Sequence, residues 1–191
     1  MNHFAADTRS RAIAYARSLL QQSPLYMDTE TTGLSRDSEI VEISIIDDDG
    51  QVVFESLIRP QNPIPAAVTA LHGITDQMVA TAPRFGLVWP QIRGVMYGRQ
   101  VGIYNSNFDL GIIEGELKRL NLRPVTINAF CILDLYSEFR AEWDPVRRRL
   151  RRFSLESAGR YFQIPLPNAH RARADALLAR AVLHCSAGAR E

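Results

Sequence analysis

Four acidic side chains stand where they could act together on one reacting group: Asp28, Glu30, Asp109 and Asp175. Asp28 and Glu30 end an apolar run that begins at Leu25, a pattern typical of a buried strand. Alternate residues of a strand point to the same face, so we expect these two carboxylates to project together. Asp109 ends the motif NSNFD at the predicted start of a helix, and Asp175 comes five residues after His170.

A cluster of four carboxylates is unfavourable unless cations neutralise it. Oxygen ligands suit the hard ions Mg²⁺ and Mn²⁺, and two such ions about 3.5–4 Å apart are a common arrangement for cleaving a phosphodiester. The residues therefore predict a site for two ions of Mg²⁺ or Mn²⁺. The alternative is that Asp28 and Glu30 are ordinary acids at a strand end and His170 is a surface histidine.

The elements that must position these acids predict an α/β fold with a mixed sheet. Helical spacing of apolar residues predicts helices over 8–21, from close to Pro90 to 96, and over 107–120, 132–142, 154–162 and 171–187. Alternation predicts strands over 25–28, 40–47, 51–59, 100–105 and 125–129, with a hairpin turn at Asp49-Gly50. The run DPVRRRLRR (144–152) is predicted to be an exposed loop.

Three motifs in this order resemble those of a known family: DTETTGL (28–34), NSNFD (105–109) and HRARAD (170–175). Together they resemble the DEDDh (DnaQ-like) superfamily of 3′→5′ exonucleases, which includes the proofreading epsilon subunit of bacterial DNA polymerase. The segments LHGIT (71–75) and LESAGRYFQIP (155–165) are also similar to the family. The resemblance covers residues 24–186. One position departs from it, because Tyr104 stands where many relatives have histidine.

The resemblance implies a ribonuclease H-like fold with a mixed five-stranded sheet flanked by helices. It implies that Asp28, Glu30, Asp109 and Asp175 are the metal ligands and that His170 is the general base. Imidazole titrates near neutral pH, which suits it to accept a proton from water. The tyrosine subclass would place Tyr at position 171, where this chain has Arg.

The resemblance also implies a set of residues that contact the terminal nucleotides: Thr29, Thr31, Gly33, Leu34, His72, Asn105 and Phe108. Leu34 would wedge beside the last base. Simpler roles remain open, because the two threonines could bond their own backbone, and His72 could cap or pack. Phe108 could equally be a core residue.

The run RRRLRR (147–152) holds five arginines in six positions. One hypothesis is phosphate contact with the incoming strand. The other is a solvated loop that pairs with nearby acids such as Glu138, Glu142 and Asp144.

Length and composition set broader limits. The chain has 191 residues and a net charge of +1. Its length predicts one domain, 23–191, preceded by a helical extension, 1–22. Cys131 and Cys185 lie far apart outside any metal-ligand pattern, and neither a membrane span nor a secretory signal is visible, so we expect reduced thiols and a cytoplasmic location.

The function expected from the sequence is a metal-dependent 3′→5′ exonuclease. It would release nucleoside 5′-monophosphates from 3′ ends of single-stranded nucleic acid, with DNA as the expected substrate. An exoribonuclease of the same fold, a polymerase-associated proofreading subunit and a non-catalytic module that binds 3′ ends are the alternatives. The sequence also leaves a homodimer open.

Overall fold

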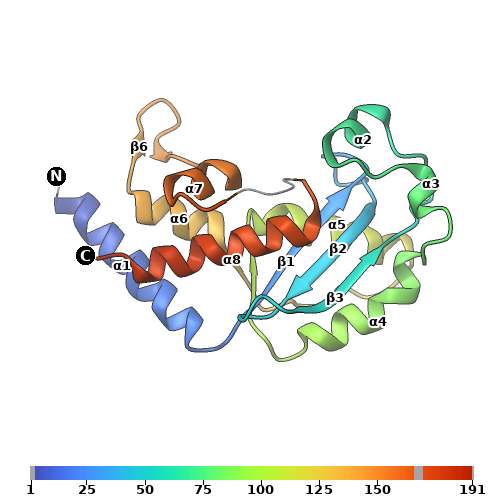
Figure 1. Ribbon diagram of the computed structural model, residues 1–191, viewed down its shortest axis with the longest axis horizontal. Helices are drawn as coiled ribbons and strands as arrows, with labels where there is room; N and C mark the ends of the chain where they lie inside the picture. Colours follow the sequence, from blue (N-terminus) through green and yellow to red (C-terminus); the bar gives the residue numbers. More distant parts are fainter. Residues whose placement is uncertain (1–2, 166–169, 191) are drawn as a thin grey trace.

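The computed structural model describes residues 3–165 and 170–190. Its centre is a five-stranded sheet in the order β3-β2-β1-β4-β5. Figure 1 shows β3, β2 and β1 side by side. The strands are β1 (Leu25–Thr31), β2 (Ile40–Ile46), β3 (Val52–Leu57), β4 (Val101–Ile103) and β5 (Ala129–Cys131). Antiparallel pairing joins β1 to β2 and β2 to β3, and parallel pairing joins β1 to β4 and β4 to β5. The predicted mixed sheet is therefore confirmed.

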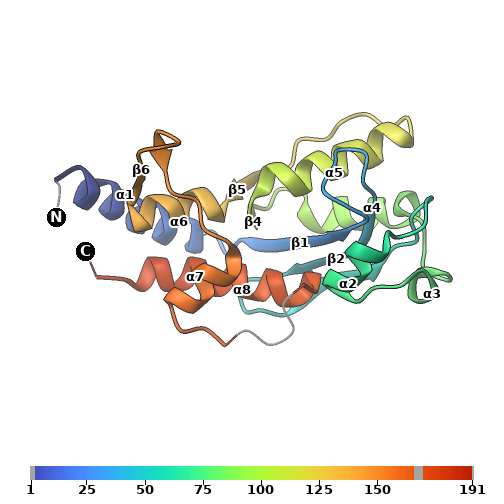
Figure 2. The same cartoon turned by 90° about the horizontal axis from the view of Figure 1, so that it is seen from above.

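Helices cover both faces of the sheet (Figure 2). One face packs against α4 (Phe85–Met96) and α5 (Ser106–Arg119), and the other against α8 (Ala172–Gly188). Three further helices pack around α8 and one another: α1 (His3–Leu20), α6 (Ile132–Arg140) and α7 (Leu155–Tyr161). Two short helices follow β3, α2 (Ala66–His72) and α3 (Asp76–Val79). No helix of the described residues is long and apolar enough to cross a membrane.

Alternation along β1 decides which face of the sheet carries the acids. Tyr26 packs in the core beneath α8, whereas Met27 packs in the core beneath α4 and α5. Because side chains alternate, Asp28 and Glu30 share the face of Tyr26 and point toward α8. Strand β2, which pairs with β1 alongside the acids, is buried along its whole length, so core packing fixes the strand next to them.

Two predicted elements differ in position from those observed. Helix α4 starts at Phe85 rather than near Pro90, because burial of Phe85, Val88 and Trp89 outweighs the single N–H that Pro90 lacks. The last strand is at 129–131 rather than 125–129, and Phe130 pairs with Gly102. A Cβ on Gly102 would lie 2.7 Å from the Phe130 ring, so glycine there makes this pairing possible.

The arginine run also differs from its prediction. A short two-stranded sheet forms from β6 (Trp143–Asp144) and β7 (Arg149–Leu150), so residues 143–150 are a hairpin rather than an irregular loop. Asp144 stabilises the turn, since its Oδ1 accepts from Val146 N at 3.0 Å and from Arg147 N at 2.9 Å. Cys131 and Cys185 are free thiols, as expected.

Candidate active site

The predicted carboxylates converge at the carboxyl end of β1. Oxygen atoms of Asp28, Glu30 and Asp175 all lie within 4.8 Å of one another. Asp109 approaches from α5, where its Oδ1 accepts a hydrogen bond from Thr29 Oγ1 at 2.7 Å. Three elements that are distant in sequence, β1, α5 and α8, therefore bring the four acids together.

Burial raises the pKa of all four acids, and two of them, Asp28 and Glu30, lack a hydrogen-bond partner among the described residues. Burial, followed by the charges of Asp109 and Asp175, raises the pKa of Asp28 well above its usual range. Burial and the same kind of repulsion raise the pKa of Glu30 to about 8. Burial raises the pKa of Asp109 to about 7, although the Thr29 hydroxyl lowers it, and burial also raises the pKa of Asp175.

This donor set fits divalent cations. Among the described residues, no hydrogen-bond donor contacts Asp28 or Glu30, and the Arg171 guanidinium lowers the pKa of Glu30 less than the surrounding acids raise it. Carboxylate oxygens in such a group are the ligands that hard divalent ions prefer. A bound cation would replace the missing compensation.

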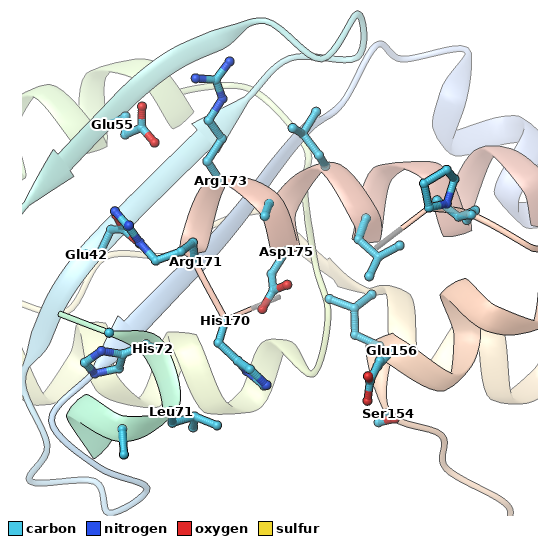
Figure 3. A pocket seen from close by; sticks show the side chains of 18 residues that line it. Glu42, Glu55, Leu71, His72, Ser154, Glu156, His170, Arg171, Arg173 and Asp175 are labelled. Atoms are coloured by element: carbon cyan, nitrogen blue, oxygen red, sulfur yellow. The ribbon is translucent and has the colours of Figure 1, made fainter. Parts of the chain in front are cut away.

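His170 lies next to the acids, on the wall of a cavity of about 1000 Å³. Its side chain is exposed, and its backbone has a left-handed conformation with φ of 67°. Figure 3 shows the His170 ring and the Asp175 carboxylate on one wall, with Ser154 and Glu156 from the start of α7 facing them. His170 and Asp175 therefore line the same cavity.

A buried acid that the sequence analysis did not single out holds this part of the site in place. Glu42, 3% exposed, accepts hydrogen bonds from the Arg171 guanidinium and, at 2.9 Å, from Ala172 N at the start of α8. It anchors the backbone between His170 and Asp175 (Figure 3). The signal in the sequence is a single acid inside the apolar strand IVEISII.

Several of the predicted substrate residues lie at the end of β1 and in the turn that follows it (31–34), directly after Glu30 in the chain. Thr31 Oγ1 donates to Gly33 O at 2.6 Å, so this threonine does bond its own backbone. A Cβ on Gly33 would lie 3.0 Å from Ser38 Oγ, which favours glycine in so close a turn. Leu34 follows with 89% of its surface exposed, an unusual position for an apolar side chain.

His72 is buried, and its polar contacts are with backbone, one of them at the end of β1. Its Nδ1 accepts from Ile74 N at 3.0 Å. Burial lowers the pKa of His72, while the Thr31 backbone raises it, which places the imidazole against the β1 turn. It also lines the cavity with His170, so a role in substrate contact stays a prediction.

The remaining two predicted residues start α5. Asn105 has a left-handed backbone, with φ of 66°, and its Oδ1 accepts from Arg152 Nη2 at 3.0 Å. Phe108 is partly buried against the core beneath α4 and α5, so its packing role is observed and a base contact stays a prediction. Tyr104, the position that departs from the family pattern, donates its hydroxyl to Phe153 O at 2.9 Å.

Comparison with known proteins places this fold and site in a family. A family model described as an exonuclease (RNase_T) matches residues 25–183, and the chain belongs to this exonuclease family. The chain is 36% identical over 133 residues to an uncharacterized exonuclease, CP81, of Escherichia phage 186, covering 66% of this chain and 69% of that protein. It is 29% identical over 153 residues to the DNA polymerase III epsilon subunit of Treponema pallidum, covering 78% and 69% of the two chains.

Solved structures agree. Exonuclease X, in complex with a 5′-overhanging duplex DNA, superposes with a TM-score of 0.65 at 26% identity, covering 85% of this chain and 89% of that one. Exonuclease I of Escherichia coli, in complex with a dA16 oligonucleotide, has the same fold, with a TM-score of 0.71 at 19% identity over 84% and 40% of the two chains. The predicted exonuclease fold and enzyme class are confirmed.

Proposed function

We propose that this exonuclease is a metal-dependent 3′→5′ enzyme that removes nucleoside 5′-monophosphates from the 3′ ends of single-stranded DNA. The observation that carries the proposal is the cluster of Asp28, Glu30 and Asp175, whose oxygens lie within 4.8 Å of one another beside the open imidazole of His170. DNA is supported by exonuclease X and exonuclease I, both solved in DNA complexes.

The four acids would hold two Mg²⁺ or Mn²⁺ ions. Such ions would supply Lewis-acid chemistry, making a water nucleophilic and neutralising the charge that develops on the phosphate. The carboxylates of Asp28, Glu30, Asp109 and Asp175 fix where these charges sit. Because β1, α5 and α8 are all packed in cores, the acids need little reorganisation during the reaction.

His170 would remove the proton from the attacking water. Its ring is exposed in the cavity, while Glu42 fixes the backbone immediately after it through Arg171 and Ala172. The leaving group is then the 3′ oxygen of the next nucleotide, and the product is a nucleoside 5′-monophosphate. Leu34 and the turn formed by Thr31 and Gly33 would contact the terminal nucleotide.

A time course on labelled oligonucleotides tests this proposal. A single-stranded DNA labelled at its 5′ end should shorten one nucleotide at a time in Mg²⁺ or Mn²⁺, and the same DNA labelled at its 3′ end should release labelled mononucleotide at once. Faster degradation of the matching RNA would favour the exoribonuclease. If the protein binds 3′ ends but cleaves nothing with any metal, it is a non-catalytic binding module. If fragments from internal cleavage appear, removal of nucleotides from the 3′ end is contradicted.

A further inference from the structure

The arginine hairpin, residues 143–152, projects from the molecule beside α6 and α7 (Figures 1 and 2). It contains β6, the turn and β7, and continues to Arg152. Its residues include five arginines against the single acid Asp144. Trp143 and Val146 add apolar surface, with exposed fractions of 57% and 88%. The projection thus presents positive charge and an exposed aromatic ring together, the combination that suits single-stranded nucleic acid.

The structure divides the five arginines by their partners. Arg147 Nη1 pairs with Asp144 Oδ2 at 3.0 Å, and Arg151 Nη1 lies 3.8 Å from Glu142 Oε2. Arg148 and Arg149 are exposed and have no ion pair or side-chain hydrogen bond with any of residues 3–165 and 170–190. The ion-pair explanation of the run therefore accounts for some of its charge and leaves two guanidinium groups for a ligand.

The base of the hairpin is fixed to the active site. Arg152 Nη2 donates to Asn105 Oδ1 at 3.0 Å, and Asn105 begins the helix that carries Asp109. Two residues further on, Ser154 lines the same cavity as His170 and Asp175. From Ser154 back to Arg149 the chain can extend at most about 17 Å, because an extended residue spans roughly 3.4 Å. The hairpin arginines therefore lie within the reach of a strand of several nucleotides whose 3′ end is in the site.

We propose that the arginine hairpin binds the backbone of a single-stranded nucleic acid whose 3′ end occupies the carboxylate site, with Arg148 and Arg149 on phosphates and Trp143 against a base. This inference rests on the proposed function for the position of the 3′ end. Guanidinium groups bind phosphate oxygens with two donors, and exposed aromatic rings stack on bases without regard to sequence. The hairpin would thus strengthen the binding of longer oligonucleotides through contacts away from the phosphodiester bond that is cleaved.

Binding in EDTA tests the hairpin separately from catalysis. The fluorescence anisotropy of a labelled sixteen-nucleotide DNA would be measured with the wild type, with Arg148→Gln/Arg149→Gln, and with Arg93→Gln/Arg123→Gln. The control pair removes two exposed charges on α4 and on the loop after α5, remote from the hairpin. We expect the hairpin variant to bind about tenfold more weakly and to lose roughly 1.4 from the log–log salt slope, about 0.7 for each lost phosphate.

The control pair should bind like the wild type. Equal affinity and equal salt slopes in the hairpin variant and the wild type would make the run a solvated hairpin and overturn the inference, as would an equal loss in the control pair. If the protein cleaves no substrate yet the hairpin variant still binds DNA more weakly than the control, the proposed activity fails while the binding surface stands.

Tryptophan fluorescence gives a second readout. The chain has two tryptophans, and Trp89 is buried in the core with 5% exposure, so an added oligonucleotide can reach only Trp143. We expect the sixteen-nucleotide DNA to quench the emission of the wild type and to have little effect on Trp143→Phe. Equal quenching of both proteins, or none in the wild type, would contradict the stacking contact.

Discussion

Two buried acids face each other across neighbouring strands and have opposite surroundings. Glu30 on β1 pairs in register with Glu42 on β2. Glu42 is compensated by a guanidinium and a backbone N–H, whereas Glu30 receives no hydrogen bond from the described residues and has a pKa of about 8. The difference separates an acid that the fold uses for its own structure from one that, under the proposed function, would bind a cation.

Other buried acids resemble Glu42 rather than Glu30. Glu39 accepts from Gln61 N and from both nitrogens of Asn62, and Glu116 accepts from Ile40 N and pairs with Arg119. Burying an uncompensated charge costs several kcal/mol, and buried acids are therefore normally paired. The unpaired acids at the end of β1 are the exception in the described part of the chain, and that exception is the candidate metal site.

Removing an unpaired acid should have the largest effect on activity. Asp28→Asn keeps the size of the side chain but removes a charge that would hold a cation. We expect the exonuclease rate to fall by about 10³-fold or more, and the wild type to lose its activity in EDTA and regain it with Mg²⁺ or Mn²⁺. Initial rates on 5′-labelled DNA measure both effects. Full wild-type activity in EDTA would contradict the claim that the unpaired acids act by binding cations.

Replacing the base should have the next largest effect. His170→Ala should lower kcat by about 10²–10⁴-fold, the usual contribution of a general base. Cation affinity should change little, because the imidazole is not placed as a ligand. The decline of kcat at acidic pH should also weaken in the variant. An alanine variant with the wild-type rate and pH profile would show that another group accepts the proton.

Changing the paired acid should have a smaller effect that falls on positioning. Glu42→Gln keeps an acceptor for Ala172 N but loses the ion pair with Arg171, so His170 and Asp175 should be less well fixed. We expect kcat to fall by about 10–100-fold with KM changed much less. Arg171→Lys should retain more activity than Arg171→Met. Glu138→Gln, an exposed acid on α6, is the matched control, and its rate should equal that of the wild type.

The comparison also predicts opposite effects on stability. At pH 8 in EDTA, Asp28→Asn should raise the free energy of unfolding by about 1–2 kcal/mol, since it removes repulsion, and Glu42→Gln should lower it by about 1–2 kcal/mol. Urea unfolding measures both. A fall in stability for both variants would show that the acids of β1 are as well compensated as Glu42.

The pH dependence of the metal-free protein follows from the same acids. The pKa of Glu30 is raised from 4.5 to about 8 in the folded state, so between these pH values the folded state binds more protons than the unfolded state. The contribution of Glu30 to the free energy of unfolding therefore falls as pH rises through this window. In EDTA, Asp28→Asn should weaken the overall decline, measured by urea unfolding across this pH range, because burial and neighbouring acids also raise the pKa of Asp28 and asparagine binds no proton there.

The sequence was sufficient to predict that the four acids lie together, but not the structure of the segments around them. Motif spacing identified Asp28, Glu30, Asp109 and Asp175, because β1, α5 and α8 are strongly patterned elements. It missed Glu42, since only the folded sheet places that acid at the start of α8. It misplaced the last strand because Val125 and Ile127 pack on the core without joining the sheet. The arginine run was mistaken for a loop because strands of two residues carry no periodic signal.

Calorimetric titration of Mn²⁺ into the apoprotein tests the central claim most directly, without DNA or turnover. The account predicts that the wild type and Glu138→Gln bind Mn²⁺, and that Asp28→Asn and Asp175→Asn lose at least one ion or most of the affinity. A wild type that binds no Mn²⁺, or an Asp28→Asn protein that binds it as the wild type does, would contradict the account.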